Sequence, residues 1–175
     1  MEQSTMLAAI RGVLALIQAS DGRIETRIRM QKEAYLLKWL GCPAFENIHF
    51  AYRFYGPYSR QLSDGLRDTV TTGGVVDTTE DWDDGNKYCY ELGEVPDDLF
   101  GEELSPAYRA AVARMADMHW RALELSATIA FLTANGRTRA EATAQALELK
   151  PDCAPWKVAA AELMDDLQQM VSAAN

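Results

Sequence analysis

Residues suited to metal binding or nucleophilic chemistry are scarce in this sequence. Among its 175 residues there are three cysteines, Cys42, Cys89 and Cys153, and no two of them have the close spacing of a zinc site. Their odd number also argues against a disulfide framework and indicates free thiols in a reducing compartment. The two histidines, His49 and His119, have no nucleophile beside them in the sequence. We therefore expect no metal and no other cofactor.

Sequence features of enzymes and membrane proteins are missing as well. There is no glycine-rich phosphate loop and no His-Glu-x-x-His pattern, so we expect a protein that is not an enzyme. No apolar run approaches the roughly 20 residues that span a bilayer. Residues 1–20 contain Glu2 and Arg11 and lack a small-residue cleavage site, which indicates a helix rather than a signal peptide. We expect a cytoplasmic protein with no membrane association.

Negative charge is concentrated in the second part of the chain. The formal net charge is −9, and residues 1–72 hold nine Lys/Arg and seven Asp/Glu, so they carry +2 and residues 73–175 carry −11. The first part could face an anion, whereas the second part would repel nucleic acid at long range.

Apolar residues at helical spacing predict two helices near the start of the chain. The first covers residues 4–20 and ends at Asp21-Gly22, where glycine can take the left-handed conformation of a helix end. The second covers residues 25–40. A basic cluster lies in the turn before it and along its N-terminal part, formed by Arg23, Arg27, Arg29 and Lys32. This cluster could receive nucleic acid, an acidic partner or the acidic second part of the chain, or it could be a solvated helix end.

An aromatic strand follows the second helix. Residues 48–54 alternate in polarity, which predicts a strand with one packed face. The residues of that face are Ile48, Phe50, Tyr52 and Phe54. Gly56-Pro57 is expected to end the strand, because these residue types are typical of turns.

A third helix and a β-hairpin come next. Ser59 is a suitable N-cap for a helix over residues 59–72. Residues 75–79 and 87–92 predict two paired strands, joined by a turn over residues 80–86. Three helices followed by a hairpin is the order of a winged helix, here with an extra strand before the third helix.

The whole sequence predicts a mostly α fold of the α+β class. We expect a winged helix-turn-helix domain over residues 1–93, a linker over residues 94–104 and an acidic α-helical extension over residues 105–175. The last helix opens at Pro155 and has an apolar seam that could support a homodimer. The seam consists of Trp156, Ala160, Leu163, Leu167 and Met170.

Two segments together resemble a known family. The first has Gly22-Arg23 and Arg27 followed by Met30-Gln31-Lys32-Glu33-Ala34-Tyr35-Leu36-Leu37, and the second is Phe54-Tyr55-Gly56-Pro57-Tyr58-Ser59-Arg60-Gln61-Leu62. They resemble the YwgA family of small prokaryotic winged-helix proteins and, more distantly, the Panacea or SocA-like antitoxin domain. The resemblance covers residues 5–92 and implies a winged-helix fold with a regulatory, antitoxin-like or phage-associated role. Met30 and Glu33 depart from the family pattern.

The turn after the aromatic strand is the candidate interaction site. A helix N-terminus offers unpaired backbone N–H groups and the positive end of the helix dipole, and Arg60 lies in the first turn, so an anionic group could dock there. The residues expected to form a partner- or anion-binding surface are Arg27, Gln31, Lys32, Tyr55, Gly56, Pro57, Tyr58, Ser59 and Arg60. The alternative is that Gly56 and Pro57 only shape the turn and the tyrosines pack on it.

DNA binding through residues 59–72 is the alternative function. The third helix offers side chains that could contact phosphates or bases. These are Arg60, Gln61, Ser63 and Arg67. Carboxylates on the same helix and in the hairpin turn oppose this function, because neutralisation of phosphates dominates affinity for nucleic acid. They are Asp64, Asp68, Glu80, Asp81, Asp83 and Asp84.

The leading functional expectation is a non-enzymatic regulatory or antitoxin-like protein that binds a protein partner through its winged-helix domain. The second expectation is a DNA-binding transcription regulator that acts as a dimer. In either case the protein would act by binding another macromolecule rather than by catalysis. A third reading, an enzyme or nucleotide-handling protein, stays open because the clustering of distant side chains in space is not visible in the sequence.

Overall fold

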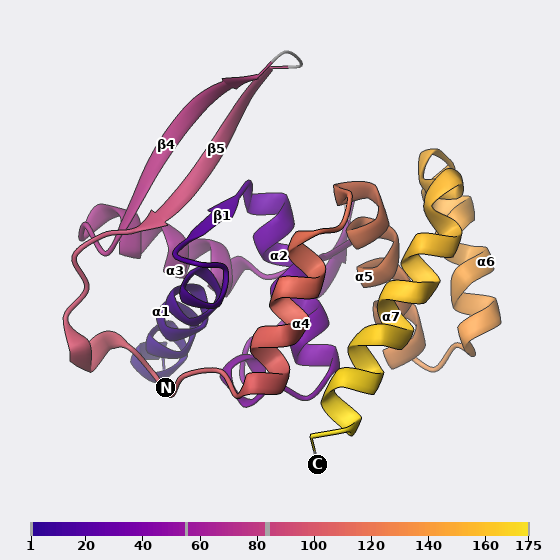
Figure 1. Ribbon diagram of the computed structural model, residues 1–175, viewed down its shortest axis with the longest axis horizontal. Coiled ribbons are helices and arrows are strands. Elements are labelled where there is room, and N and C mark those ends of the chain that lie inside the picture. Colours follow the sequence, from indigo (N-terminus) through magenta and orange to yellow (C-terminus); the bar gives the residue numbers. More distant parts are fainter. Residues whose placement is uncertain (1, 55, 83–84, 175) are drawn as a thin grey trace.

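The computed structural model of the chain describes residues 2–54, 56–82 and 85–174. Over these residues the protein belongs to the α+β class, as predicted: it is 64% helical with a small antiparallel sheet (Figure 1). The α-helices are α1 (Glu2–Ala19), α2 (Arg27–Trp39), α3 (Arg60–Thr71), α4 (Pro106–Ala116), α5 (Trp120–Ala134), α6 (Arg139–Leu149) and α7 (Lys157–Ser172). The strands are β1 (Arg23–Glu25), β2 (Ala51–Arg53), β3 (Gly56–Tyr58), β4 (Val75–Trp82) and β5 (Gly85–Leu92). Three short 3₁₀ helices are η1 (Pro43–Phe45), η2 (Asp97–Leu99) and η3 (Pro151–Trp156).

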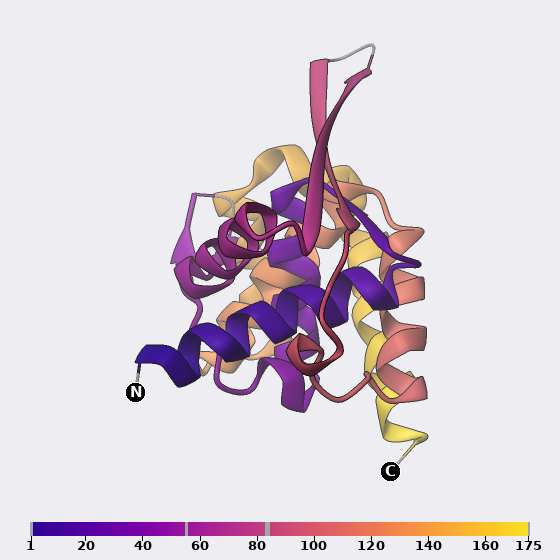
Figure 2. The same cartoon turned by 90° about the vertical axis from the view of Figure 1, so that its left-hand side faces the viewer.

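The three-stranded sheet has the order β1-β5-β4. The predicted hairpin is confirmed and is longer than expected, since β4 and β5 pair from Val75↔Leu92 to Trp82↔Gly85. The turn residues Asp83 and Asp84 lie outside the described residues. Both views of the ribbon show the hairpin projecting from the helical body (Figures 1 and 2).

Strand β1 was not predicted from the sequence. Residues 23–25 pair with β5 through Ile24↔Tyr90, and the second helix therefore starts at Arg27 rather than at residue 25. Thr26 ends the strand and caps the helix, because its side-chain oxygen accepts a hydrogen bond from the backbone N–H of Arg29 at 3.2 Å. A strand of three residues is too short to show a period-two pattern, which explains the error.

The aromatic strand is shorter than predicted. Only Ala51–Arg53 forms a strand, β2, and it pairs antiparallel with β3, so Gly56 and Pro57 belong to a second strand instead of simply ending the first. Ile48 and Phe50 are buried as expected, whereas the Phe54 side chain is 93% exposed. Of the predicted packed face, only Ile48 and Phe50 are therefore buried.

Helix α3 begins as predicted. The Ser59 hydroxyl oxygen accepts a hydrogen bond from the backbone N–H of Leu62 at 3.2 Å. Leu62 and Leu66 are buried, and the helix packs on α1 at Gly65, where a Cβ would lie 3.1 Å from the Cβ of Ala9. This close approach packs one face of α3 against α1 and leaves the opposite face exposed to solvent.

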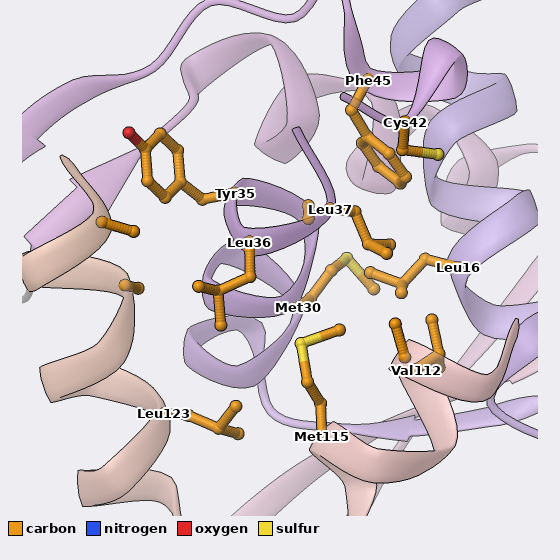
Figure 3. Close-up of a cluster of buried hydrophobic side chains, with 14 of the residues drawn as sticks. Leu16, Met30, Tyr35, Leu36, Leu37, Cys42, Phe45, Val112, Met115 and Leu123 are labelled. Carbon is orange, nitrogen blue, oxygen red and sulfur yellow. The ribbon is translucent and has the colours of Figure 1, made fainter. Parts of the chain in front are cut away.

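One continuous cluster of buried apolar side chains holds both parts of the chain together. Helix α2 lies at its centre. In Figure 3, Met30 and Leu37 of α2 face Leu16 of α1, while Met115 of α4 and Leu123 of α5 line the same core. The core is thus shared between residues 1–93 and residues 105–175, and the predicted division into two domains remains a prediction about independent folding.

The segment predicted as a linker packs on the core. Leu104 is buried, and Val95, Leu99 and Phe100 lie partly buried against the core cluster. Five of the eleven residues 94–104 are Asp or Glu, and this acidic composition favoured the prediction of a linker although the segment also contains these apolar side chains.

The apolar seam of the last helix is used inside the chain. Ala160, Leu163 and Leu167 are fully buried, and α7 packs against α4 and α5. These three side chains are therefore not exposed for a homodimer contact, whereas Trp156 and Met170 of the seam are partly exposed, and the predicted homodimer stays a prediction. Thr138 and Glu141 form a capping box at the start of α6.

Candidate binding groove

The side chain of Gln31 links the two segments that carry the family resemblance. Oε1 of Gln31 accepts a hydrogen bond from the backbone N–H of Ser59 at 2.7 Å, and its Nε2 donates to the carbonyl oxygen of Ser59 at 2.9 Å. Nε2 also donates to the Ser63 hydroxyl at 2.9 Å. Gln31 and Ser59 are both buried. Gln31 therefore fixes the start of α3 against α2.

A buried charged cluster holds the turn before α3. Lys32 donates to the carbonyl oxygen of Pro57 at 3.0 Å, and Lys150 donates to the carbonyl oxygen of Phe54 at 3.2 Å. Lys150 also forms an ion pair with Glu124, in which both side chains are 7% exposed. Burial lowers the pKa of Lys32 to about 8, against the opposing effect of Glu124. Residues from α2, α5 and the end of α6 thus position the strands β2 and β3.

Gly56 allows this turn to lie close to α5. Its φ of +91° favours glycine, and a Cβ at this position would lie 2.8 Å from Oγ1 of Thr128. Gly56 is therefore required by packing as well as by backbone geometry.

A groove of about 750 Å³ lies between α3 and the base of the hairpin. Positively charged side chains and aromatic rings form its walls, and apolar side chains form its floor. We define the arginine groove by Arg27, Arg53, Arg60 and Arg67, the aromatic residues Phe54, Tyr58 and Tyr90, and the floor residues Leu66 and Val70. Asp64 and Asp77 also line it.

Two arginines of the groove lie against tyrosines. Nε of Arg27 donates to the hydroxyl of Tyr90 at 3.0 Å. This hydrogen bond raises the pKa of Arg27, and the nearby Tyr58 and Tyr88 contribute in the same direction. The guanidinium carbon of Arg53 lies 5.5 Å from the ring centroid of Tyr58, a cation–π distance. Arg27 and Arg53 are therefore held in place by aromatic neighbours.

The other two arginines share a carboxylate on α3. Asp64 pairs with Arg60 at 3.6 Å and with Arg67 at 3.0 Å, while the arginine side chains stay 85% and 67% exposed. Such exposed pairs are weak, so both guanidinium groups can exchange Asp64 for an incoming group.

The structure divides the predicted partner- or anion-binding residues into two groups. It brings Arg27, Tyr58 and Arg60 together in the arginine groove. The other described residues of the predicted surface are buried and form or support the turn before α3. They are Gln31, Lys32, Gly56, Pro57 and Ser59. Tyr55 lies outside the described residues. The predicted contact residues are thus partly a surface and partly its scaffold.

The predicted nucleic-acid contacts divide in a similar way. Arg60 and Arg67 are exposed on α3. Oε1 of Gln61 instead accepts a hydrogen bond from the backbone N–H of His49 at 2.7 Å, and Ser63 is bonded to Gln31. Two of the four residues are therefore occupied by contacts within the chain.

The basic cluster around the start of α2 does not form one surface. Arg23 pairs with Glu80 at 2.7 Å and with Glu91 at 3.2 Å on the sheet. Arg29 donates to the carbonyl oxygens of Met115 and Met118 at the end of α4. These residues bind different parts of the protein, so the cluster predicted from the sequence is dispersed.

Sequence reasoning missed several residues that shape the site. Arg53 alternates with the aromatic residues of its strand, and this signal placed it opposite the packed face without assigning it a role. Glu124 and Lys150 gave no local signal, because they lie at least 67 positions beyond the turn that they hold.

No group of three or more His, Cys, Asp or Glu side chains is arranged to hold a metal ion within the described part of the chain. The helices described here include none with the length and apolarity needed to cross a membrane. No family model, curated protein or solved structure matches the chain. The resemblance to the YwgA family therefore stays a prediction.

Proposed function

We propose that the protein is a non-enzymatic, winged-helix regulatory protein that binds a protein partner through the arginine groove. The element order α1-β1-α2-α3-β4-β5, with the sheet order β1-β5-β4, supports the winged-helix assignment. An antitoxin-like role in a prokaryotic or phage-associated system, which the family resemblance implies, is one form of this function.

The composition of the arginine groove carries this proposal. Arginine and tyrosine are enriched among the residues that dominate binding energy at protein interfaces. Here Arg53 and Tyr58 lie together, beside the almost fully exposed ring of Phe54. A large apolar side chain exposed next to arginines favours a partner that offers both apolar and acidic groups.

Charge favours a protein over DNA as the partner. Asp64 and Asp77 line the groove between the arginines, and the chain as a whole carries −9. Binding to DNA depends on an excess of positive charge facing the phosphates, which this surface offers only weakly. A folded protein with mixed charge fits the groove better.

Co-purification with the product of an adjacent gene tests the proposal. We expect the wild-type protein to retain that product, and a variant with Arg53→Glu and Arg60→Glu to bind it at least about tenfold more weakly, a loss of about 1.4 kcal/mol. Arg137→Glu is the matched control, since Arg137 is exposed outside the groove. Retention by the double variant at wild-type level would refute the assignment of the groove.

DNA binding remains the second candidate function because Arg60 and Arg67 are exposed on α3. A mobility shift with DNA from the gene's own promoter, at two salt concentrations, separates the two functions. Specific binding that weakens steeply with salt and is lost on Arg67→Glu would favour DNA. The present proposal predicts no specific shift.

A further inference from the structure

The hairpin leaves a long strand edge without a partner. β1 pairs with β5 only from Cys89 to Glu91, and β4 is the outer strand of the sheet. Figures 1 and 2 show the far part of the hairpin standing clear of the helices. An open strand edge of this length is a template for pairing with another chain.

One backbone bond shows which groups of β4 point outward. The N–H of Gly93 donates to the carbonyl oxygen of Gly74 at 3.0 Å, and β4 and β5 continue this ladder in register. Because hydrogen-bonded pairs alternate in an antiparallel ladder, Asp77, Thr79 and Asp81 turn their N–H and C=O groups away from β5. No hydrogen bond to these outward backbone groups occurs within residues 2–54, 56–82 and 85–174.

The side chains along this edge set the chemistry of a partner. Asp77 and Asp81 lie four positions apart, so both project from the same face of β4, with Thr79 between them. All three are exposed, and neither aspartate forms an ion pair within the described residues. On the opposite face Glu80 is paired with Arg23. The face of β4 that carries Asp77 is also the one that borders the arginine groove.

We propose that β4 binds an extended segment of a protein partner as an added strand, and that this segment carries two basic residues four positions apart. The pairing would satisfy the outward backbone groups, and the basic side chains would lie opposite Asp77 and Asp81. This inference rests on the proposed function in taking a protein as the partner, but it concerns the outer edge of β4, which meets the arginine groove at Asp77. A second copy of β4 is a poor occupant, because its aspartates would face these aspartates.

A synthetic peptide tests this inference without knowledge of the natural partner. The probe is the capped peptide Thr-Lys-Val-Thr-Val-Lys-Thr, titrated into the ¹⁵N-labelled full-length protein. We expect the amide signals of Asp77, Thr79 and Asp81 to shift and their hydrogen exchange to slow. A peptide with glutamate in place of both lysines should bind at least about tenfold more weakly, because two attractive charge pairs become repulsive.

Matched substitutions at Thr79 separate strand addition from simple charge attraction. Thr79→Pro removes one outward N–H of β4 without removing a hydrogen bond to β5. We expect this variant to bind the lysine peptide at least about tenfold more weakly, and we expect the peptide no longer to slow hydrogen exchange at the amides of Asp77 and Asp81. Thr79→Val keeps the N–H and should bind like the wild type. Replacement of Asp77 and Asp81 by lysine should reverse the preference between the two peptides.

Three results would overturn the inference: equal binding by Thr79→Pro and the wild type, amide shifts in the arginine groove without shifts at Thr79 and Asp81, or peptide-independent dimerisation through β4 in sedimentation. Failure of the proposed function would be seen differently, as unchanged partner binding by the arginine variants. The two tests therefore fail independently.

Discussion

Gln31 brackets the backbone of Ser59 with two hydrogen bonds, accepting from its N–H at 2.7 Å and donating to its C=O at 2.9 Å. A side-chain amide thus takes the place of a neighbouring strand at the junction of β3 and α3. Both residues are buried, so neither backbone group of Ser59 has water as an alternative partner.

Loss of the two hydrogen bonds between Gln31 and Ser59 should destabilise the fold. We expect Gln31→Ala to lower the free energy of unfolding by about 1–3 kcal/mol, because it leaves the buried backbone N–H of Ser59 without a partner, while the C=O of Ser59 keeps the bond from the backbone N–H of Ser63 at 3.3 Å. Urea denaturation followed by circular dichroism measures this value. Gln168→Ala, on the exposed face of α7, should change it by less than about 0.5 kcal/mol. Similar values for the two variants would contradict the structural role of Gln31.

Substitution of Gly56 should destabilise the protein for two separable reasons. Gly56→Ala should cost about 1–3 kcal/mol for the positive φ, together with a further penalty for the contact with Thr128. Gly136→Ala isolates the first effect, since Gly136 has φ +92° and no heavy atom within 4 Å of an added Cβ. Adding Thr128→Ala to Gly56→Ala should recover part of the loss in thermal denaturation. A strictly additive double variant would show that the contact is unimportant.

Glu33 should make the stability depend on pH. Burial raises its pKa from 4.5 to about 7, although Arg29 opposes this shift. The folded protein then binds one more proton than the unfolded chain between these pH values, so stability falls as pH rises through that window, by up to roughly 3 kcal/mol. Glu33→Gln should remove this dependence, as measured by urea denaturation from pH 4 to pH 8, whereas the exposed Glu148→Gln should not. An identical pH profile for Glu33→Gln and the wild type would contradict this account of Glu33.

The two parts of the chain should depend on each other for folding. A fragment of residues 1–93 lacks Met115, Leu123 and the other apolar side chains that cover α2, and it also lacks the Glu124–Lys150 pair that holds the turn. We expect this fragment to show no cooperative unfolding transition in urea, in contrast to the full chain. A cooperative transition in the fragment would support independent domains.

The sequence was most informative where a signal is local. Ser59 as a helix cap and the hairpin follow from residue types within a few positions of one another, and both are confirmed. The three residues of β1 are too few for a periodic pattern, so that strand was assigned to the adjacent turn and helix.

The candidate site was less predictable because it depends on distant contacts. Arg27 and Arg60 were identified as site residues, but nothing local shows that Tyr90 approaches Arg27 or that Lys150 holds Phe54. Residue type alone also could not separate exposed residues from buried ones. Gln31 and Lys32 have polar side chains, and the structure uses them to support the turn.

Photo-cross-linking from the position of Phe54 tests the central claim most directly, because this side chain is 93% exposed at the groove. With p-benzoylphenylalanine in place of Phe54, we predict ultraviolet-dependent cross-linking in the host cell to one protein species, and loss of that product when Arg60→Glu is added. The same photo-reactive residue in place of Val158, which is 67% exposed on α7, should not give that product. An equal yield from both positions, or a product at Phe54 that consists of DNA, would contradict the assignment of the arginine groove as a protein-binding surface.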